Sequence, residues 1–190
     1  MGSFFVIIGV SKIYLMQLRP HQEKAIKAMS KHNKGQVIVP TGGGKTICMI
    51  HDAIEQFKSD RLKTIVVVAP RILLANQLCE EFLEFIDDVD VLHVHSGETH
   101  HTSTTKSKVI EEWYWASKKH QLIFTTYHSL HKIQDATAML PDTVYFDEAH
   151  NAVQKNFIEA VEHHSMYVVR NYFFTATPKH SFTPFKTGMN

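Results

Sequence analysis

The sequence contains few cysteines and no long apolar segment. Its 190 residues include only Cys48 and Cys79, which are too few for a disulfide framework or a cysteine-rich zinc module. No apolar run approaches the roughly 20 residues that a membrane-spanning helix needs. The net charge of +1 excludes a strongly basic protein that coats nucleic acid, although it leaves room for a local basic strip. We therefore predict a protein without a membrane segment, from the cytoplasm or another reducing intracellular compartment (that of a host cell if the protein is viral).

The remaining composition is that of an ordinary globular domain. Hydrophobic residues make up 44% of the chain and charged residues 21%. The first apolar stretch, residues 4–8, is too short for a secretory signal and has no basic residues before it. We predict an N-terminal extension or edge strand over residues 1–15 and one folded domain over residues 16–178.

A glycine-rich stretch organises the chain. An apolar segment at residues 37–39 leads into Pro40-Thr41-Gly42-Gly43-Gly44-Lys45-Thr46, and helical periodicity follows. A strand, a glycine loop and a Lys-Thr pair that opens a helix are the context of a phosphate-binding loop. Backbone N–H groups there attract phosphate, while Lys45 reaches the β- and γ-phosphates and the Thr46 hydroxyl binds Mg²⁺. The general pattern has a glycine where this chain has Val39, which leaves a different loop subtype or a chance match.

Ahead of this loop, a helix is predicted to begin at Pro20, because proline suits the first turn of a helix. Gln22 lies in that turn. Its amide offers a donor and an acceptor, the pair that can read the N6 and N7 edge of adenine. The alternative is a solvent-exposed helical glutamine, and the residue by itself does not decide between the two.

Strand and helix patterns alternate along the rest of the chain without a hairpin turn. This pattern predicts an α/β fold, in which a parallel sheet is flanked by helices on both faces. Strands are expected at residues 64–69, 90–94, 122–126, 143–146 and 170–174. The carboxyl ends of parallel strands meet at one edge of the sheet, where ligands bind. The residues that follow strands and should meet there are Pro70, Arg71, Thr125, Thr126, Asp147, Glu148, His150, Thr175, Ala176 and Thr177.

Five of these positions suggest specific chemistry. Asp147 can hold Mg²⁺ through its water shell, and Glu148 can position or deprotonate an attacking water. Arg71 lies beside a helix N-terminus, which suits a nucleic-acid phosphate, although a local cap or ion pair would explain it as well. The hydroxyls of Thr125 and Thr126 could also meet a phosphate at this edge.

Two other groups of residues have plainer explanations. His93, His95, His100 and His101 lie in or near a polar loop, and we predict no structural metal there. No cysteine is near them in the sequence, and their spacing is not that of a zinc motif. The aromatic segment at residues 113–115 lies between lysines, and it suits either a platform for stacking bases or a helix that buries its first tryptophan. We favour the helix.

Taken together, these stretches resemble the first RecA-like motor lobe of superfamily 2 helicases and translocases. The similarity runs from about Leu18 to Pro178. In order, LRPHQ resembles the adenine-reading Q motif, PTGGGKT motif I, VVAPRILLANQ motif Ia, TTYHSL motif Ib or its close neighbour, DEAH motif II and TATP motif III. Motif I of this superfamily commonly lacks the first glycine, so Val39 fits. The Q motif and the glycine loop look more like those of restriction-subunit, repair and phage-type DNA motors than those of DEAH-type RNA helicases.

The resemblance implies ATP and Mg²⁺ as cofactors and nucleic acid as the partner, with DNA favoured over RNA. It implies catalytic roles for Lys45, Asp147 and Glu148. The nucleotide-binding residues that it implies are Arg19, Gln22, Thr41, Gly42, Gly43, Gly44, Lys45 and Thr46, with Mg²⁺ held at Thr46 and Asp147. The residues implied to contact nucleic acid are Pro70, Arg71, Thr125 and Thr126. The residues implied to couple nucleotide state to lobe movement are His150, Thr175, Ala176 and Thr177.

Motors of this kind complete the ATP site with arginines from a second RecA-like lobe, whose motifs do not follow in this sequence. We expect residues 179–190 to begin the connection to a second lobe that is missing from this chain. Without those arginines, the lobe should bind ATP weakly and hydrolyse it very slowly. The competing hypothesis is a single-lobe module that binds nucleotide or nucleic acid without efficient turnover.

Overall fold

Seven parallel strands form one sheet in the computed structural model, which describes residues 12–40, 42 and 44–177. The order of the strands across the sheet is β1-β7-β6-β2-β5-β3-β4, and every pairing is parallel. The strands are β1 (Lys34–Ile38), β2 (Thr64–Ala69), β3 (Val89–Val94), β4 (Thr102–Ser103), β5 (His120–Thr126), β6 (Thr143–Phe146) and β7 (Arg170–Thr175). All of their carboxyl ends therefore face the same edge of the sheet.

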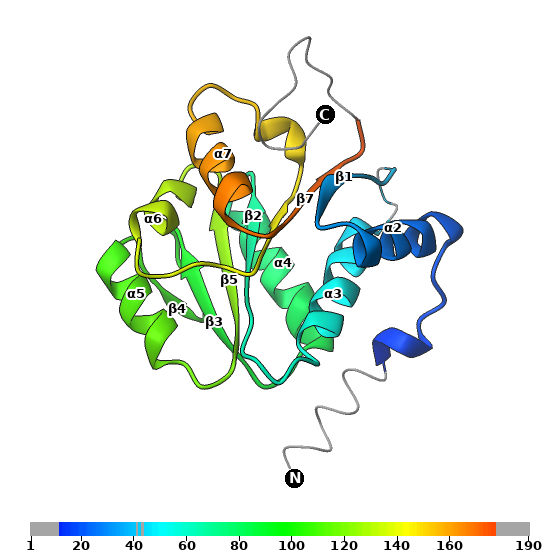
Figure 1. Ribbon diagram of the computed structural model, residues 1–190, viewed down its shortest axis with the longest axis horizontal. Coiled ribbons are helices and arrows are strands. Elements are labelled where there is room, and N and C mark those ends of the chain that lie inside the picture. The colour runs from blue at the N-terminus through cyan, green and yellow to red at the C-terminus, as the bar shows by residue number, and fades with distance from the viewer. Residues whose placement is uncertain (1–11, 41, 43, 178–190) are drawn as a thin grey trace.

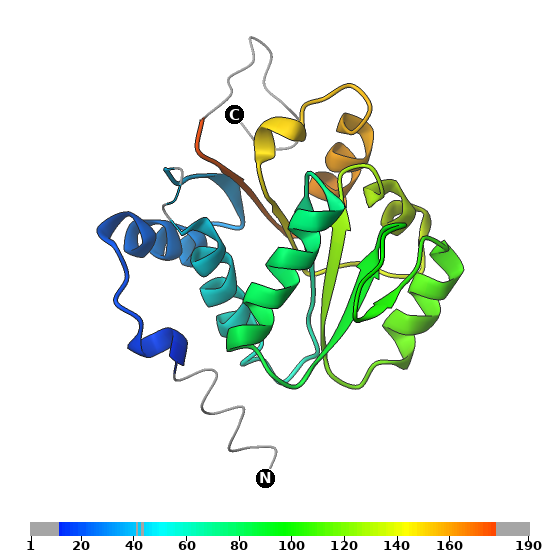
Figure 2. The same cartoon turned by 180° about the vertical axis from the view of Figure 1, so that it is seen from behind.

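Helices cover both faces of the sheet (Figures 1 and 2). One face carries α2 (Pro20–Lys31), α3 (Lys45–Gln56) and α4 (Ile72–Phe85). The other carries α5 (Ser107–Ala116), α6 (Leu130–Asp135) and α7 (Ile158–Tyr167). A short 3-10 helix, η1 (Ala149–Asn151), follows β6. The architecture is a three-layer α/β fold, as the alternation of patterns in the sequence predicts.

The central strands are buried on both sides, so two hydrophobic cores form. All six residues of β2 are buried. Ile65 and Val67 point into the core beneath α2, α3 and α4, whereas Val66 and Val68 point into the core beneath α5, α6 and α7. Burial of each such side chain contributes about 1.5 to 3 kcal/mol relative to its exposure, which explains the continuous β-branched sequence of this strand.

The predicted elements agree closely with the structure. The strands predicted at residues 64–69 and 143–146 have those bounds, and the others are longer by one or two residues. The polar loop near the four histidines contains the strand β4, which the sequence does not predict, because two residues are too few to give a periodic pattern. The aromatic segment does lie on a helix, α5, where Trp113 is partly buried and Trp115 is 69% exposed.

Some predictions fall partly on residues 1–11 and 178–190, which lie outside the described residues. These are the N-terminal extension, the end of the folded domain and the connection to a second lobe, and they stay predictions. None of the helices in the described part of the chain has the length and apolar character that crossing a membrane requires.

Candidate active site

The phosphate loop depends on two glycines in a left-handed conformation. Gly42 has φ +71° and Gly44, the N-cap residue of α3, has φ +75°. Only glycine adopts such angles without strain. A Cβ on Gly44 would also lie 2.3 Å from the Gln22 amide nitrogen, so a larger residue here would push the Gln22 side chain away from the loop. Thr41 and Gly43, also assigned to the loop, lie outside the described residues.

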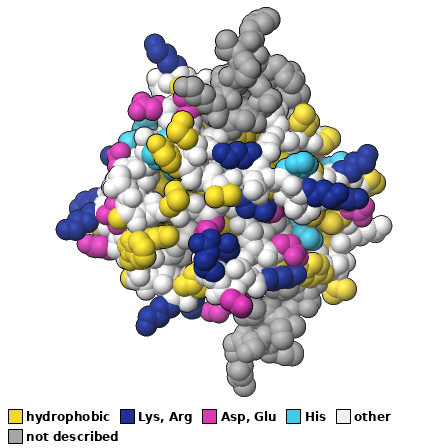
Figure 3. All heavy atoms as spheres, viewed as in Figure 1, with side chains coloured by type: hydrophobic (Ala, Val, Ile, Leu, Met, Phe, Trp, Pro, Cys, Tyr) yellow, Lys and Arg dark blue, Asp and Glu magenta, His cyan; other side chains and the backbone are white. Residues whose placement is uncertain are grey.

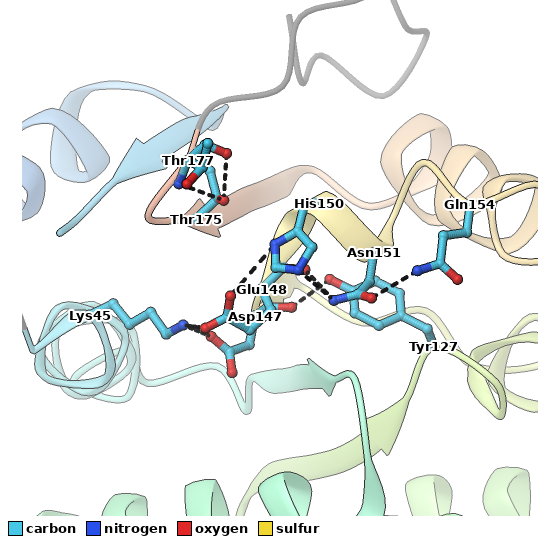
Figure 4. A network of polar contacts seen from close by, with 9 residues as sticks. All are labelled: Lys45, Tyr127, Asp147, Glu148, His150, Asn151, Gln154, Thr175 and Thr177. Carbon is cyan, nitrogen blue, oxygen red and sulfur yellow. Dashed lines mark hydrogen bonds and ion pairs between the residues drawn. The ribbon is translucent and has the colours of Figure 1, made fainter. Parts of the chain in front are cut away.

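Lys45 joins this loop to the acidic pair after β6. It opens α3, and its Nζ lies 2.9 Å from Oδ1 of Asp147 and donates a hydrogen bond to Oε1 of Glu148 (Figure 4). Burial alone would lower the pKa of Lys45, but the two carboxylates outweigh that effect and raise it. The ammonium group is therefore charged, and it lies where it can meet an anion at the loop.

Asp147 is a buried carboxylate with an incomplete set of partners. The residue is 4% exposed, and burial raises its pKa although Lys45 opposes the change. Beyond the ion pair with Lys45, Oδ1 accepts no hydrogen bond from the described residues. The backbone is held on both sides: its N–H donates to the Val68 carbonyl at 2.8 Å, and the Tyr127 hydroxyl donates to its carbonyl at 2.7 Å. The carboxylate is thus rigidly placed and has capacity left for a cation.

Glu148 has a strained backbone that turns its side chain toward the phosphate loop. Its φ of +47° lies in the left-handed region, which is uncommon for a residue with a Cβ. The Asn151 side chain donates a hydrogen bond of 2.9 Å to its carbonyl and stabilises this turn. His150 lies on the other side, with Nδ1 3.6 Å from Oε2 of Glu148 (Figure 4). Strain of this kind clusters at functional sites.

A cleft of about 250 Å³ opens between the loop and the acidic pair. The described residues that line it are Val39, Pro40, Gly42, Gly44, Lys45, Thr46, Glu148 and Ala176. A third carboxylate lies nearby, since Glu81 of α4 hydrogen-bonds to Thr46; burial raises the pKa of Glu81, and this bond lowers it. The cleft therefore combines phosphate-binding backbone, a lysine and several oxygen ligands.

Gln22 braces the phosphate loop. It is 6% exposed, so the alternative of a solvent-exposed glutamine is wrong. Its Oε1 accepts a hydrogen bond from the Arg19 N–H at 2.8 Å, and its Nε2 donates one to the Gly44 carbonyl at 3.2 Å. The Arg19 guanidinium donates to the Gly42 carbonyl at 3.0 Å. Both residues thus lie at the loop, and their direct contact with adenine stays a prediction.

Thr175 ends β7 and lies beside β1, and Thr177 follows two residues later. Thr175 is fully buried, and its hydroxyl donates to the Thr177 carbonyl at 2.9 Å while accepting from the Thr177 N–H at 3.2 Å. The Thr175 carbonyl accepts a hydrogen bond from the Val39 N–H at 3.1 Å. No hydrogen bond joins these threonines to His150 within the described part of the chain. Their coupling role stays a prediction.

The residues predicted to contact nucleic acid differ in accessibility. Arg71 is exposed and caps α4 without a side-chain hydrogen bond, so a local pairing of its guanidinium is not seen among the described residues, and Pro70 beside it is partly buried. Thr125 is fully buried and donates its hydroxyl to the Val94 carbonyl at 2.7 Å. Thr126 is 4% exposed, and its hydroxyl accepts from the Ser129 N–H. The buried hydroxyls have no surface for a phosphate, so the structure does not support those two contacts.

The sequence reasoning missed residues that hold the site in shape. Tyr127 and Asn151 fix the backbone of the acidic pair, and Glu81 reaches Thr46 from α4. Tyr127 directly follows β5, so its place after a buried strand was the available signal. It also missed that Cys79 lies beside His93 and His101, because the two segments meet only in the folded chain. No cysteine is near these histidines along the sequence, but Cys79 is near two of them in the fold, so sequence distance was the wrong criterion.

Comparison with known proteins gives the family of this chain. The family "type III restriction enzyme, res subunit" matches residues 15–180. None of the curated proteins matches the sequence at a significant level.

Solved structures share the fold at low sequence identity. A nuclease-deletion mutant of the type ISP restriction–modification enzyme LlaGI, in complex with a DNA substrate mimic, has a TM-score of 0.71 and 22% identity over 87% of this chain. The DNA-bound, ATP-dependent type ISP enzyme LlaBIII has a TM-score of 0.66 and 21% identity over 88% of the chain. The Hef helicase domain of Pyrococcus furiosus has a TM-score of 0.63 and 22% identity over 91%.

The chain is much shorter than these proteins. It covers 18% of the LlaGI chain, 13% of the LlaBIII chain and 35% of the Hef domain chain. The matched family spans nearly the whole sequence, and the parallel sheet with its phosphate loop and acidic pair agrees with it. The chain belongs to the type III restriction enzyme res-subunit family, and it is a RecA-like lobe of the superfamily 2 helicase kind.

Proposed function

We propose that this chain is the ATP-binding lobe of a DNA-dependent motor that couples ATP hydrolysis to translocation along DNA or to its unwinding. The observation that carries the proposal is the ion pair between Lys45 and Asp147 at the phosphate loop, 2.9 Å long, with Glu148 beside it. A triphosphate would take over the ammonium group of Lys45. Glu148 would then be free to orient or deprotonate the attacking water.

The cation ligands fit Mg²⁺, which prefers oxygen donors. Asp147 supplies a buried carboxylate oxygen whose one partner among the described residues is the Lys45 ammonium, and Thr46 supplies a hydroxyl at the start of α3. When bound, Mg²⁺ would neutralise negative charge on the β- and γ-phosphates. The remaining work falls to the protein, which orients the phosphates through the loop and through Lys45.

DNA is the proposed track because the DNA-bound enzymes LlaGI and LlaBIII share the fold. Arg71 is exposed at the N-terminus of α4, where a backbone phosphate would find a positive charge and free N–H groups. On the face shown in Figure 3, lysine and arginine side chains are spread among acidic ones and do not form one basic patch. Contact with DNA would therefore be local, at the carboxyl edge of the sheet.

The ATP site would be completed by a second lobe. Of the four arginines, Arg61 and Arg170 lie at the amino ends of β2 and β7 and pair with acidic side chains there. Arg19 is bound to Gly42, and Arg71 lies after β2. None of them lies across the cleft from the phosphate loop, where an arginine finger would act. Such arginines contribute about 10³ to 10⁵ in turnover.

The experiment is an ATPase assay of the full-length protein titrated with single- and double-stranded DNA and RNA, run beside the 190-residue chain. DNA should stimulate the full-length protein more than RNA, and the short chain should be slower by about 10³-fold or more. Stronger stimulation by RNA would contradict the preference for DNA. Robust DNA-stimulated turnover by the short chain would contradict the need for a second lobe. A full-length protein that binds ATP without turnover would favour the binding-module hypothesis.

A further inference from the structure

A second cluster of ligand-type side chains lies outside the proposed ATP site. Cys79 comes from α4, His93 from β3 and His101 from the residue before β4. One sulfur atom and one nitrogen atom from each histidine all lie within 4.8 Å of one another. Cys79 is a free thiol, and both Cys79 and His93 are 1% exposed. Three metal-binding side chains from separate elements thus converge at one point.

His93 has a buried nitrogen without a partner. Its Nε2 makes no hydrogen bond with any of the described residues. A buried polar atom of this kind is costly, and native proteins satisfy nearly all of them. The ring is held in place by stacking on Phe124, with the ring centroids 5.6 Å apart. The orphaned nitrogen therefore points to a ligand at this position.

The other nitrogen of His93 has the partner that a metal-binding histidine needs. Its Nδ1 lies 3.0 Å from Nε2 of His95, which is also buried. Histidines that bind metals almost always donate their second ring N–H to a neighbouring acceptor, which sets the orientation of the ring, and Nε2 of His95 can be that acceptor once His95 carries its proton on Nδ1.

His101, the third residue of the cluster, is positioned by the sheet and lines a cavity. β4 pairs with β3 so that Ser103 lies opposite His93, and the Thr104 N–H donates to the His93 carbonyl at 3.0 Å. This pairing holds His101 near the cluster. All three ligand residues line a cavity of about 810 Å³, which also borders His100. There is room for an ion and for a further ligand from solvent.

We propose that Cys79, His93 and His101 bind a zinc-type transition metal ion, with water or an external ligand in the fourth position. One thiolate and two imidazoles suit Zn²⁺ and Co²⁺ and do not suit Mg²⁺. The ion would join α4 to the loop between β3 and β4, which already meet where the Asn76 side chain donates to the Glu98 carbonyl at 3.2 Å. Because α4 begins beside Arg71, the metal would steady the edge that the proposed motor presents to DNA.

Binding requires specific local changes. The ligand atoms must close to roughly 3.5 Å from one another around a tetrahedral ion. The Cys79 thiol must release its proton to solvent, since the thiolate is the ligand. The Gly97 N–H donates to Nδ1 of His95 at 3.1 Å, so the His95 proton lies on Nε2, between the two histidines. When a metal ion binds Nε2 of His93, the proton on Nε2 of His95 would move to Nδ1 of His93. His95 then takes the proton displaced from Nε2 of His93 on its own Nδ1, and the bond from Gly97 breaks.

The test is a titration of the metal-free, untagged chain with Co²⁺. Binding is monitored by the thiolate-to-metal charge-transfer absorption and by the amide resonance of Gly97. We expect one equivalent to bind, with the absorption band and the Gly97 shift appearing together. His101→Ala lies in a loop and should keep the fold while weakening binding by about 100-fold or more. Cys79→Ser should abolish the band.

The matched control is His100→Ala, which removes the adjacent histidine from the same cavity and should change affinity by less than about threefold. Absence of a charge-transfer band at one equivalent would overturn the proposal. So would unchanged binding by His101→Ala, or equal weakening by His100→Ala, which would indicate loose binding to surface histidines. None of these readouts depends on ATPase activity, so the proposed motor function and the metal site can fail separately.

Discussion

Two aspartates of this domain are almost equally buried, yet their surroundings differ. Asp52, in α3, is 6% exposed, and Asp147, after β6, is 4% exposed. Burial raises the pKa of both carboxyls, and a basic side chain opposes the rise in each case: Arg170 at Asp52 and Lys45 at Asp147. The first carboxylate has a complete shell of donors, whereas the second does not.

The shell around Asp52 is built from neutral and charged donors. Oδ1 pairs with Arg170, and Oδ2 accepts hydrogen bonds from Gln56, at 2.8 Å, and from the Tyr145 hydroxyl. The Thr143 hydroxyl in turn donates to the side-chain amide oxygen Oε1 of Gln56 at 2.6 Å. A buried charge with all of its partners supports the fold. A buried charge with partners missing, as at Asp147, is suited to receive something that comes and goes.

The largest expected effect is on ATP binding and turnover, which should depend on Lys45, the basic partner of Asp147, and hardly on Arg170, the basic partner of Asp52. In the full-length motor, Lys45→Ala should abolish measurable ATP binding and lower turnover by about 10³-fold or more, because the phosphates lose the lysine of the phosphate loop. Arg170→Met should leave turnover within about threefold at a temperature where it stays folded. Nucleotide binding and ATPase rates check both. Equal losses in the two variants would mean that the Asp52 cluster is also part of the catalytic machinery.

The next effect separates binding from hydrolysis within the acidic pair. Glu148→Gln keeps the shape of the side chain and loses its basicity, so ATP affinity should stay within about threefold while hydrolysis falls by about 10² to 10⁴-fold. Single-turnover hydrolysis and equilibrium binding measure the two quantities. Glu159→Gln, in the first turn of α7, is the control and should behave like the wild type. Wild-type turnover by Glu148→Gln would remove this residue from its proposed role.

For the free energy of unfolding we expect the reverse order, with the partner of Asp52 mattering more than the partner of Asp147. Arg170→Met leaves the Asp52 carboxylate buried without its cation and should lower the free energy of unfolding by about 2 to 3 kcal/mol; this figure is reduced because Arg170 is 23% exposed. Urea denaturation of the chain measures it. Arg61→Met is the matched control, since its ion pair with Asp142 has the arginine 72% exposed and should contribute less than about 1 kcal/mol. Similar losses in both would show that burial does not distinguish the pairs.

The smallest effect concerns pH at the two aspartates. A carboxyl whose pKa is raised by folding favours the folded state below its unfolded value, near 3.8, and this contribution is lost as the pH rises through the folded pKa. Asp147→Asn removes that loss, so it should be at least as stable as the wild type at neutral pH, with the difference shrinking as the pH approaches 4. Asp52→Asn removes the same loss, but it should be less stable than the wild type at neutral pH, because Arg170 has no second carboxylate among the described residues, whereas Lys45 keeps Glu148.

Thermal unfolding of the two asparagine variants between about pH 4 and pH 7.5 tests this pH dependence. A marked destabilisation by Asp147→Asn at neutral pH would show that its ion pair with Lys45 is a structural bond. In that case the difference between the two buried aspartates would not hold.

The sequence predicts the parts of this domain that lie close together along the chain. The phosphate loop and the acidic pair are short motifs after buried strands, so their position at one edge follows from the parallel topology. The conformations that make them work are less visible. The left-handed backbone of Glu148 depends on Asn151 and on the tyrosine after β5, and no local pattern encodes that angle.

Contacts between distant segments are the part that sequence reasoning could not supply. Asp52 and Gln56 are polar residues one turn apart in α3, a pattern that in the sequence indicates an exposed helical face. In the fold they are covered by Arg170 and Tyr145, which come from two different strands. The burial of Thr125 was also hidden, because a threonine at a strand end looks accessible unless its partner carbonyl is known.

The position of β7 has a consequence for the dimensions of the site. β7 lies between β1 and β6, so the phosphate loop and the acidic pair are two strand spacings apart, or about 10 Å. Backbone hydrogen bonds fix that spacing, and β7 therefore sets the distance that the Lys45 side chain must span. A longer side chain at the acidic pair would overfill the gap. A bulge in β7 would change this distance, and so impair the site, without altering any residue that touches ATP.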